Sequence, residues 1–327
     1  SLSESDKIFD YYFLIDDRIE RIIIKKKLKY FKIFSSSLKF SPLLPINLAK
    51  IILGFLQSLI IFIKHKPQIV VGFGGYTSIP SILAAKVLKI KIIIHEQNAV
   101  MGKTNRFLSY LTKNIALTFK NTKYAKNCSV HTGIPVREKK KKNLQSKSKL
   151  KRIFVVGGSQ GAKIFSKLIP KLIENFSSTS KKHLIVVQQV RKEDMELTIN
   201  SYKEMQIKSI IKNFFDDIYF QLDRADLIIS RCGSSTLAEI ELYNKFSVLF
   251  PLPSATDNHQ NSNAVEFKKN NQCLICDERR LDLKKISMEI EKIVFKKKLH
   301  KIKSSKKKLN SKLSLLDFMR KIIVENA

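Results

Sequence analysis

Residues Asp226–Glu239, which read DLIISRCGSSTLAE, have the types and spacing needed to hold a phosphate group. Asp226–Ser230 is predicted to form a short strand, Gly233 to turn the chain, and Ser234–Thr236 to begin a helix. The first N–H groups of a helix lack partners within it and lie at the positive end of its dipole, so that they bind anions. Glu239 would accept hydrogen bonds from a sugar hydroxyl. Taken alone, this pattern is more often a capped turn without a ligand.

A second glycine-rich turn, GGSQG at Gly157–Gly161, follows the predicted strand Ile153–Val156. Its small residues let a ligand approach the backbone, and Ser159 adds a hydroxyl. The loop after the predicted strand Val248–Phe250 is also polar, and contains Asp257, His259 and Gln260, and a further helix is predicted to begin over Asn263–Lys269. Polar groups therefore follow successive strands at one edge of the predicted sheet, where open α/β sheets bind ligands.

The first half of the chain has the same organisation, with GFGG at Gly72–Gly75 between the predicted strand Gln68–Val71 and the predicted helix Ile79–Leu88. A further strand, Lys91–Ile94, leads into the polar cluster HEQN at His95–Asn98. Strand–helix–strand order predicts a parallel sheet with right-handed crossovers. GFGG is a weak signal by itself, because tight turns use glycine for backbone reasons alone.

Length and charge set broader limits. The 327 residues suffice for two α/β domains, each with its own core. Lys and Arg number 61 against 28 Asp and Glu, a net charge of +33. Nucleic-acid binding, attraction to an anionic membrane and compositional drift toward lysine would each give such an excess. The lysines are spread along the chain and no nucleic-acid-binding motif is recognisable, which favours drift with some membrane attraction and no nucleic-acid partner.

The chain has four cysteines, Cys128, Cys232, Cys273 and Cys276. The last two form a CxxC without a second pair or a nearby histidine, whereas structural zinc requires four ligands, so no metal site is predicted. No signal peptide is recognisable, and we expect reduced thiols in a cytoplasm.

Leu43–Ile63 is the most apolar stretch and approaches the length of a membrane span, but polar residues interrupt it. An amphipathic helix that packs on a sheet is favoured over one that lies on a membrane. Its wide apolar face comprises Leu48, Ile51, Ile52, Phe55, Leu59, Ile60 and Ile63.

The highly charged run Glu138–Lys151 predicts a solvated linker between domains. The expected division is therefore residues 1–137, a linker at 138–151, a second domain at 152–310 and a C-terminal helix at 311–327. The apolar stripe of that last helix comprises Leu313, Leu316, Phe318, Met319 and Ile322.

Together the motifs resemble those of the MurG family, across nearly the whole chain. The motifs that carry the resemblance are GFGGYTSIP at Gly72–Pro80, HEQNAVMGKTNR at His95–Arg106, GIPVR at Gly133–Arg137, GGSQGA at Gly157–Ala162, SRCGSSTLAE at Ser230–Glu239 and DNHQNSNA at Asp257–Ala264. The resemblance implies an inverting glycosyltransferase that moves GlcNAc from UDP-GlcNAc to the MurNAc C4 hydroxyl of undecaprenyl-linked lipid I, giving lipid II in peptidoglycan synthesis. It also implies a GT-B fold, with two Rossmann-like domains of parallel sheets facing a cleft.

The resemblance further assigns roles by motif position. The pyrophosphate would bind at Ser234–Ala238, the ribose at Glu239, and the uracil beside Arg137 and the main chain of Phe215. The residues implied to bind substrate are Asn98, Arg137, Ser159, Phe215, Ser234, Ser235, Thr236, Leu237, Ala238, Glu239, His259 and Gln260. The helix N-terminus would stabilise the leaving pyrophosphate without a metal, and no cofactor is expected.

One motif of the family, a glycine-rich GGTGGH-like loop near its start, has no counterpart here. Its histidine is the usual candidate for the catalytic base, so the base is unknown; His95 and Glu96 are weak substitutes, more often residues that shape a loop. The first domain would then lack a central strand, as in a fragment or an inactive truncated copy. Another GT-B enzyme, such as a nucleotide-sugar epimerase, is the alternative in a different class.

The lipid acceptor implies a peripheral enzyme at the cytoplasmic face of the bacterial inner membrane. The apolar stretch Leu43–Ile63 and the lysines Lys25–Lys27, Lys29 and Lys32 would favour an anionic membrane surface as a partner.

Overall fold

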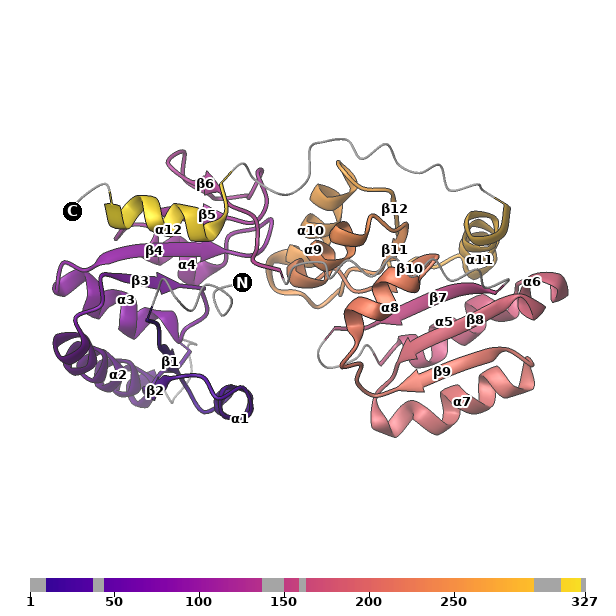
Figure 1. The fold of residues 1–327 in the computed structure, drawn as a ribbon, viewed down its shortest axis with the longest axis horizontal. Coiled ribbons are helices and arrows are strands. Elements are labelled where there is room, and N and C mark those ends of the chain that lie inside the picture. Colours follow the sequence, from indigo (N-terminus) through magenta and orange to yellow (C-terminus); the bar gives the residue numbers. More distant parts are fainter. Residues whose placement is uncertain (1–9, 38–43, 137–149, 159–162, 297–312, 325–327) are drawn as a thin grey trace. The chain divides into compact units, whose positions relative to one another are not determined.

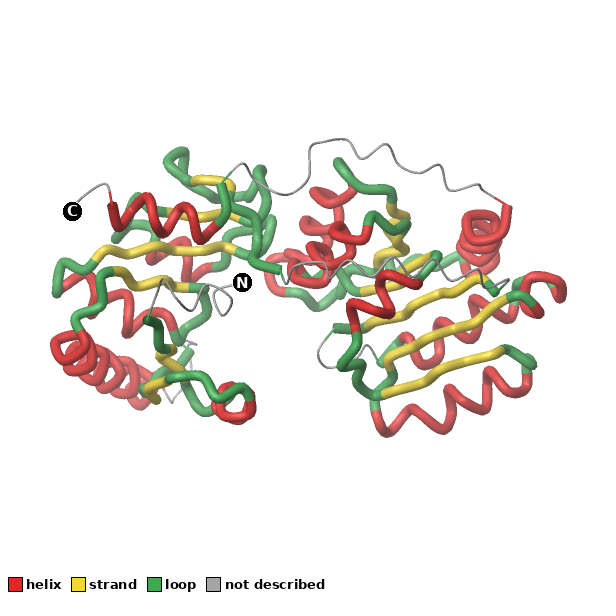
Figure 2. The backbone as a smooth tube through the Cα atoms, in the orientation of Figure 1, coloured by secondary structure: helices red, strands yellow, loops and turns green. Residues whose placement is uncertain are grey.

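The computed structural model describes residues 10–37, 44–136, 150–158, 163–296 and 313–324 of the chain. The chain forms two compact units, Ser1–Pro135 together with Asn310–Ala327, and Val136–Leu309. Helices and strands alternate along the chain in both units (Figure 2), as expected of α/β domains.

The second unit is built on a six-stranded parallel sheet with the order β12-β11-β10-β7-β8-β9 (Figure 1). The chain runs outward from β7 through β8 to β9, and then returns to the opposite side of β7 to form β10. This reversal creates a switch point between β7 and β10, the place where open α/β sheets bind ligands. The strands are β7 (Lys151–Val156), β8 (Leu184–Gln189), β9 (Lys208–Lys212), β10 (Leu227–Ser230), β11 (Ser247–Leu249) and β12 (Cys273–Ile275).

Helices cover both faces of this sheet. Ile153 and Val155 of β7 belong to a core with α5 (Phe165–Glu174), α7 (Met195–Glu204) and α11 (Leu283–Glu291). Side chains alternate along a strand, so Phe154 and Val156 face the other side. On that side lie α8 (Ile218–Arg224), α9 (Ser234–Tyr243) and α10 (His259–Lys268), which contact one another in chain order. The short helix α6 (Ser178–Lys182) leads into β8.

The first unit contains a four-stranded parallel sheet in chain order, and β1 (Phe13–Ile15) pairs with β2 (Tyr30–Lys32) in a separate two-stranded parallel sheet. A short helix, α1 (Glu20–Lys25), connects β1 to β2. The four strands are β3 (Ile69–Gly72), β4 (Lys91–Glu96), β5 (Ile115–Leu117) and β6 (Val130–His131).

Strand β4 extends beyond the predicted end at Ile94. Glu96 still pairs with Leu117 of β5, so that His95 and Glu96 are strand residues and not the start of a loop. The pairing is tertiary, which is why the local pattern of apolar residues ended the strand too early.

The two faces of the four-stranded sheet pack on helices from distant parts of the chain. Ile92 and Ile94 of β4 contact a core formed with α2 (Leu44–His65), α3 (Ser78–Val87) and α4 (Lys103–Leu108). Ile93, which points the other way, packs against α12 (Leu315–Val324), and its buried residues are Leu315, Phe318, Met319 and Ile322. The Lys91 ammonium group donates to the carbonyl oxygens of Ile322 and Ile323, both at 3.0 Å, and so caps the end of α12.

Helix α2 buries a narrower stripe than the predicted face. Its buried residues are Ile51, Gly54, Ser58 and Phe62, whereas Leu48, Ile52, Ile60 and Ile63 are exposed. Gly54 permits this packing, because a Cβ at that position would overlap the carbonyl oxygen of Phe34. By length and composition α2 could span a membrane, although one such helix is a weak signal.

Candidate functional site

The turn between β10 and α9 has the geometry of an anion site. Gly233 precedes the helix with an extended backbone, φ −66° and ψ 136°, and no side chain caps the helix. The first helical bond runs from the Leu237 N–H to the Gly233 carbonyl oxygen, 3.0 Å. The N–H groups of Ser234, Ser235 and Thr236 therefore lie outside the helical ladder, at the positive end of the α9 dipole.

Two side chains of helix α10 hold the backbone of this turn by hydrogen bonds. The Gln260 side-chain oxygen accepts from the Cys232 N–H at 3.1 Å and from the Leu252 N–H at 3.0 Å. The buried Asn263 amide donates to the Cys232 carbonyl oxygen at 3.1 Å. Because two backbone donors require an oxygen, the orientation of the Gln260 amide is fixed, and its NH₂ group is the one presented to a ligand.

Helix α10 begins at His259 rather than at the predicted Asn263. Asp257 and Asn258 both adopt left-handed backbone conformations, with φ of 52°, which Asp and Asn tolerate and which turn the chain directly into the helix. The His259 Nδ1 atom lies 2.7 Å from the Thr256 carbonyl oxygen, so this nitrogen carries a proton and Nε2 is the atom left for a ligand.

Glu239 is held by a residue that the sequence patterns did not single out. The Tyr219 hydroxyl donates to the Glu239 carboxylate at 3.1 Å, and the Tyr219 ring stacks on Tyr243 at 6.4 Å between centroids. Tyr219 lies on α8, so only the packing of α8 against α9 brings it to this carboxylate.

The side chain of Phe215 lies in the core. It is 5 % exposed, and its ring meets Phe154 edge to face at 5.5 Å between centroids. A ligand beside Phe215 would therefore meet its main chain. Two other residues predicted to contact the nucleotide, Arg137 and Ser159, lie outside the described residues.

In the first unit, His95 is buried and engaged at both ring nitrogens. Its Nε2 lies 2.9 Å from the Gly133 carbonyl oxygen, while Nδ1 accepts from the Gln97 amide at 3.2 Å. Burial lowers the pKa of His95, and the Gly133 hydrogen bond only partly opposes this, so the ring is neutral with its proton on Nε2. The ring thereby joins the end of β4 to the segment that follows β6.

Glu96, 2 % exposed, closes the HEQN loop. Its carboxylate accepts from the backbone N–H of Asn98 at 2.9 Å, from that of Gly102 at 3.0 Å and from the Asn105 amide at 2.8 Å. The side-chain amide of Asn98 also reaches this carboxylate, at 3.3 Å. Four hydrogen bonds saturate a buried anion and fix the loop around it.

The glycine turn after β3 packs against this loop. Gly74 and Gly75 have φ of 79° and 70°, and a Cβ on Gly74 would lie 3.0 Å from the Asn105 amide nitrogen. The Ser78 hydroxyl donates to the Gly74 carbonyl oxygen at 2.9 Å. Glycine is needed at Gly74 both for the left-handed backbone and for the close approach to Asn105.

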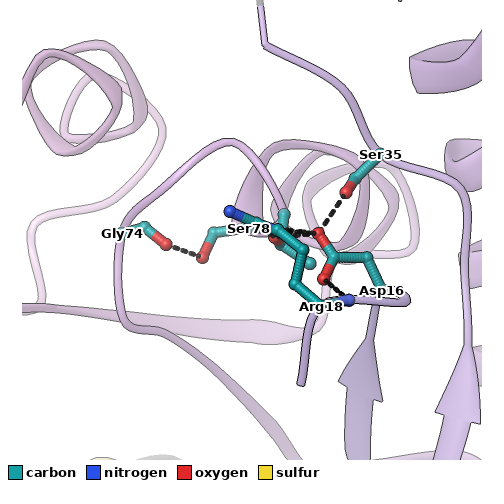
Figure 3. A network of polar contacts seen from close by, with 6 residues as sticks. Asp16, Arg18, Ser35, Gly74 and Ser78 are labelled. Atoms are coloured by element: carbon teal, nitrogen blue, oxygen red, sulfur yellow. Dashed lines mark hydrogen bonds and ion pairs between the residues drawn. The ribbon is translucent and has the colours of Figure 1, made fainter. Parts of the chain in front are cut away.

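A carboxylate at the end of β1 ties the small sheet to the same turn (Figure 3). Asp16 accepts from the Arg18 guanidinium, from the Ser35 hydroxyl at 3.1 Å and from the Thr77 hydroxyl at 3.2 Å. The same guanidinium donates to the Thr77 hydroxyl at 2.7 Å and lies 4.1 Å from the centre of the Tyr76 ring.

Cys273 and Cys276, the pair of the CxxC motif, are both buried free thiols. Burial raises the pKa of Cys273 to about 11 and that of Cys276 to about 12, so both thiols are protonated at neutral pH. Within the described ranges, no three His, Cys, Asp or Glu side chains are grouped as they would be around a metal ion.

The structure thus gathers the predicted residues into two groups. Ser234–Thr236, Glu239, His259 and Gln260 lie at the carboxyl edge of the second sheet, after β10 and β11. His95, Glu96 and Asn98 lie at the carboxyl edge of the first sheet, beside the glycine turn.

Two family models match the chain. The glycosyltransferase family 28 C-terminal domain matches residues 152–318, and the N-terminal domain of the same family matches residues 2–117. With the two parallel sheets, these matches define a two-domain α/β glycosyltransferase of the GT-B class.

Similar proteins indicate the family within this class of glycosyltransferases. A Wolbachia protein named UDP-N-acetylglucosamine–N-acetylmuramyl-(pentapeptide) pyrophosphoryl-undecaprenol N-acetylglucosamine transferase is 37 % identical over 80 % of this chain and 76 % of its own length. The MurG crystal structure from Acinetobacter baumannii matches with a TM-score of 0.75 at 23 % identity, over 100 % of this chain and 93 % of that one. A Neisseria meningitidis UDP-GlcNAc 2-epimerase shares the fold at a TM-score of 0.58 and 11 % identity, over 86 % of this chain and 82 % of that one. The chain belongs to the MurG family.

Proposed function

We propose that the chain transfers N-acetylglucosamine from UDP-GlcNAc to the MurNAc C4 hydroxyl of undecaprenyl-pyrophosphoryl-MurNAc-pentapeptide, forming lipid II. Relatives of this chain are named as the transferase of this reaction. The observation in the fold that supports it best is the start of α9, where Gly233 offers no side-chain cap, beside a Gln260 amide whose oxygen is held by two backbone N–H groups. A phosphate site next to a fixed hydrogen-bond donor suits a sugar diphosphate.

On the donor side, the pyrophosphate of UDP-GlcNAc binds the N–H groups at the start of α9. Charge grows on this group as the bond to the anomeric carbon breaks, so fixed N–H dipoles stabilise the transition state more than the ground state. Glu239 accepts from the ribose, the Gln260 NH₂ group donates to a GlcNAc hydroxyl oxygen, and the main chain of Phe215 meets the uracil. The other donor contacts come from Leu237, Ala238 and His259, together with Arg137 and Ser159.

On the acceptor side, His95 and Glu96 shape the loop that positions Asn98, and neither acts as the base. The Nδ1 lone pair of His95 already accepts from Gln97, and each Glu96 oxygen already accepts hydrogen bonds. A base must have a free lone pair within reach of the hydroxyl proton.

We further propose that the exposed face of α2 lies on an anionic membrane, as a polyprenyl-linked acceptor requires of a peripheral enzyme at the cytoplasmic face. Ile52, Ile60 and Ile63 are each more than half exposed, at 51 %, 67 % and 61 %. The net charge of +33 adds attraction to anionic lipids. Flotation with anionic but not neutral vesicles is expected, and Ile60→Glu should weaken it.

A matched control for that variant is Leu197→Glu, which adds the same charge at an apolar side chain, 48 % exposed, on α7 of the second unit. Equal loss of flotation in both variants would show that charge alone, and not the α2 face, governs the binding.

The reaction itself is tested by incubating the full chain with UDP-GlcNAc and lipid I and identifying the products by mass spectrometry. Lipid II and free UDP are expected. A 2-epimer of the sugar nucleotide, or no conversion by a chain that binds UDP, would refute the proposed reaction. Gln260→Ala, which is expected to weaken binding of UDP-GlcNAc, is the matched variant.

A further inference from the structure

The side chain of Arg231 joins several loops of the donor half. Arg231 directly follows β10, and its guanidinium forms an ion pair with Glu278 in which the two side chains are 11 % and 10 % exposed. It also donates to the Phe250 carbonyl oxygen at 3.2 Å, and its carbon lies 5.1 Å from the centre of the Phe165 ring. One cation thus contacts a carboxylate, a carbonyl and an aromatic face.

These partners come from different parts of the sheet edge. Phe250 follows β11 and opens the loop that leads to Gln260, while Phe165 is the first residue of α5, after the glycine turn of β7. Glu278 follows β12. The backbone of Arg231 itself enters the turn before α9. A single guanidinium therefore connects the first residue of α5 with the segments that follow β10, β11 and β12.

We propose that Glu278 is a positioning residue of the donor site, which acts by holding the Arg231 guanidinium in this arrangement. The inference rests on the proposed function, because it is the UDP-GlcNAc contacts of these loops that the pair would align. Arg231 has no need to touch the ligand in this role. One terminal nitrogen, Nη1, donates to both the Glu278 carboxylate and the Phe250 carbonyl oxygen, while the planar guanidinium also faces the Phe165 ring.

Because the ion pair is buried, each of its charges depends on the other for compensation. When one member of a buried ion pair is neutralised, the other remains as an uncompensated charge and moves toward water or another partner. In Glu278→Gln the guanidinium would keep the Phe250 carbonyl but lose its carboxylate, and would be drawn toward the nearest anion. The loops after β10 and β11 would then lose their common anchor.

The test uses the full chain with Glu278→Gln and, as a matched control, Asp277→Asn. Asp277 is the adjacent carboxylate, but it is exposed and bonds only locally, to Arg279 at 2.8 and 3.0 Å. At a temperature well below the unfolding transition, Glu278→Gln is expected to raise the KM for UDP-GlcNAc about tenfold and to leave the KM for lipid I within about twofold. Asp277→Asn should change neither.

A second measurement does not depend on the reaction. Amide hydrogen exchange should become faster in Glu278→Gln at the Cys232 and Leu252 N–H groups, which bond to Gln260, and remain unchanged at β8. Wild-type protection of these amides together with a wild-type KM for UDP-GlcNAc would overturn the inference.

Failure of the proposed function and failure of the inference about Glu278 can be distinguished. If the wild-type chain bound no UDP-GlcNAc, the proposed function would fail, while the exchange experiment would still decide whether Glu278 holds the loops. Arg231→Lys provides a conservative variant: it keeps the charge but loses the planar group that faces Phe165, and it should also raise the KM for UDP-GlcNAc. A wild-type donor KM in Arg231→Lys would contradict a role for the guanidinium plane and show that a positive charge beside Glu278 is enough.

Discussion

In each unit a buried charged side chain joins several loops, but its charged partner is exposed in one network and buried in the other. In the first unit the Asp16 carboxylate joins β1, the segment at Ser35 and the glycine turn at Thr77, and its cationic partner Arg18 is 56 % exposed (Figure 3). In the second unit the cation is central, and both Arg231 and its partner Glu278 are about nine-tenths buried. When the Asp16 charge is removed, water can solvate the exposed Arg18. When Arg231 is removed, the buried Glu278 is left without such compensation. The comparison teaches that similar connections carry different energetic weight according to burial.

The largest effect is expected from Arg231→Ala. Removal of the guanidinium leaves the Glu278 carboxylate buried and unpaired, which costs about 3–5 kcal/mol of unfolding free energy. Urea denaturation of the full chain measures this loss. A loss no larger than that of Asp16→Asn would break the comparison between the two networks.

The second-largest effect is expected from variants of Gln260. They separate the role of its amide oxygen in holding the loops from the role of its NH₂ group in binding the sugar. Gln260→Glu keeps an oxygen for the Cys232 and Leu252 N–H groups but removes the NH₂ donor. A lost hydrogen bond of about 2 kcal/mol would raise the KM for UDP-GlcNAc roughly 30-fold, with little change in stability. Gln260→Ala should raise the KM and also lower the stability. Equal stability in both variants would argue that the amide oxygen does not hold the loops.

Asp16→Asn should cost about 1 kcal/mol, because the exposed Arg18 is resolvated when the carboxylate is neutralised. Burial by itself raises the pKa of Asp16, but the hydrogen bonds from Arg18 and Ser35 outweigh it and hold the pKa below its usual value. The stabilisation is therefore present above the unfolded pKa, near 3.9, and is lost as the pH falls through the folded pKa. The unfolding free energies of the wild type and Asp16→Asn, measured by denaturation at pH 7 and at pH 3, should differ less at pH 3.

The smallest effect concerns His95. Its folded pKa lies below the unfolded value of about 6.5, since burial disfavours the charged ring. The neutral ring therefore stabilises the fold above that pH, and the contribution declines as the pH falls toward the folded pKa. His95→Gln should flatten the pH dependence of stability below about pH 6.5. His131, whose pKa burial also lowers, is the control: His131→Gln should remove a separate part of this dependence.

The local pattern of the sequence predicted the strands that lead into the candidate site and their parallel order. Strands β3, β7, β10 and β11 lie within a residue or two of the predicted ranges, because each is an apolar run that ends at glycine or polar residues. Element ends were less accurate at β4 and at α10. Glu96 remains in β4 through its pairing with β5, and α10 starts early through two left-handed residues.

For the candidate site, the motifs predicted residues that would present groups to a ligand, but most of the residues that hold them carry no such signal. Ser234–Thr236, Glu239 and Gln260 stand in recognisable order along the chain. Tyr219 and Glu278 carry no such signal, since a tyrosine or a glutamate on a polar helix or loop is common, whereas Asn263 lies within the motif DNHQNSNA but its role in holding the turn was not predicted. Only their contacts with Glu239, Cys232 and Arg231 set them apart.

The sequence by itself determined the β10–α9 turn, because a short strand, a glycine and a run of small hydroxyl residues specify it within a few positions. Tertiary structure alone decided how that turn is held. Arg231 lies 19 residues from Phe250 and 47 from Glu278, and at such separations the order of strands in the sheet, rather than local spacing, determines which side chains meet. The buried ion pair at the sheet edge is a product of that order, and it is this pair that we propose to align the donor site.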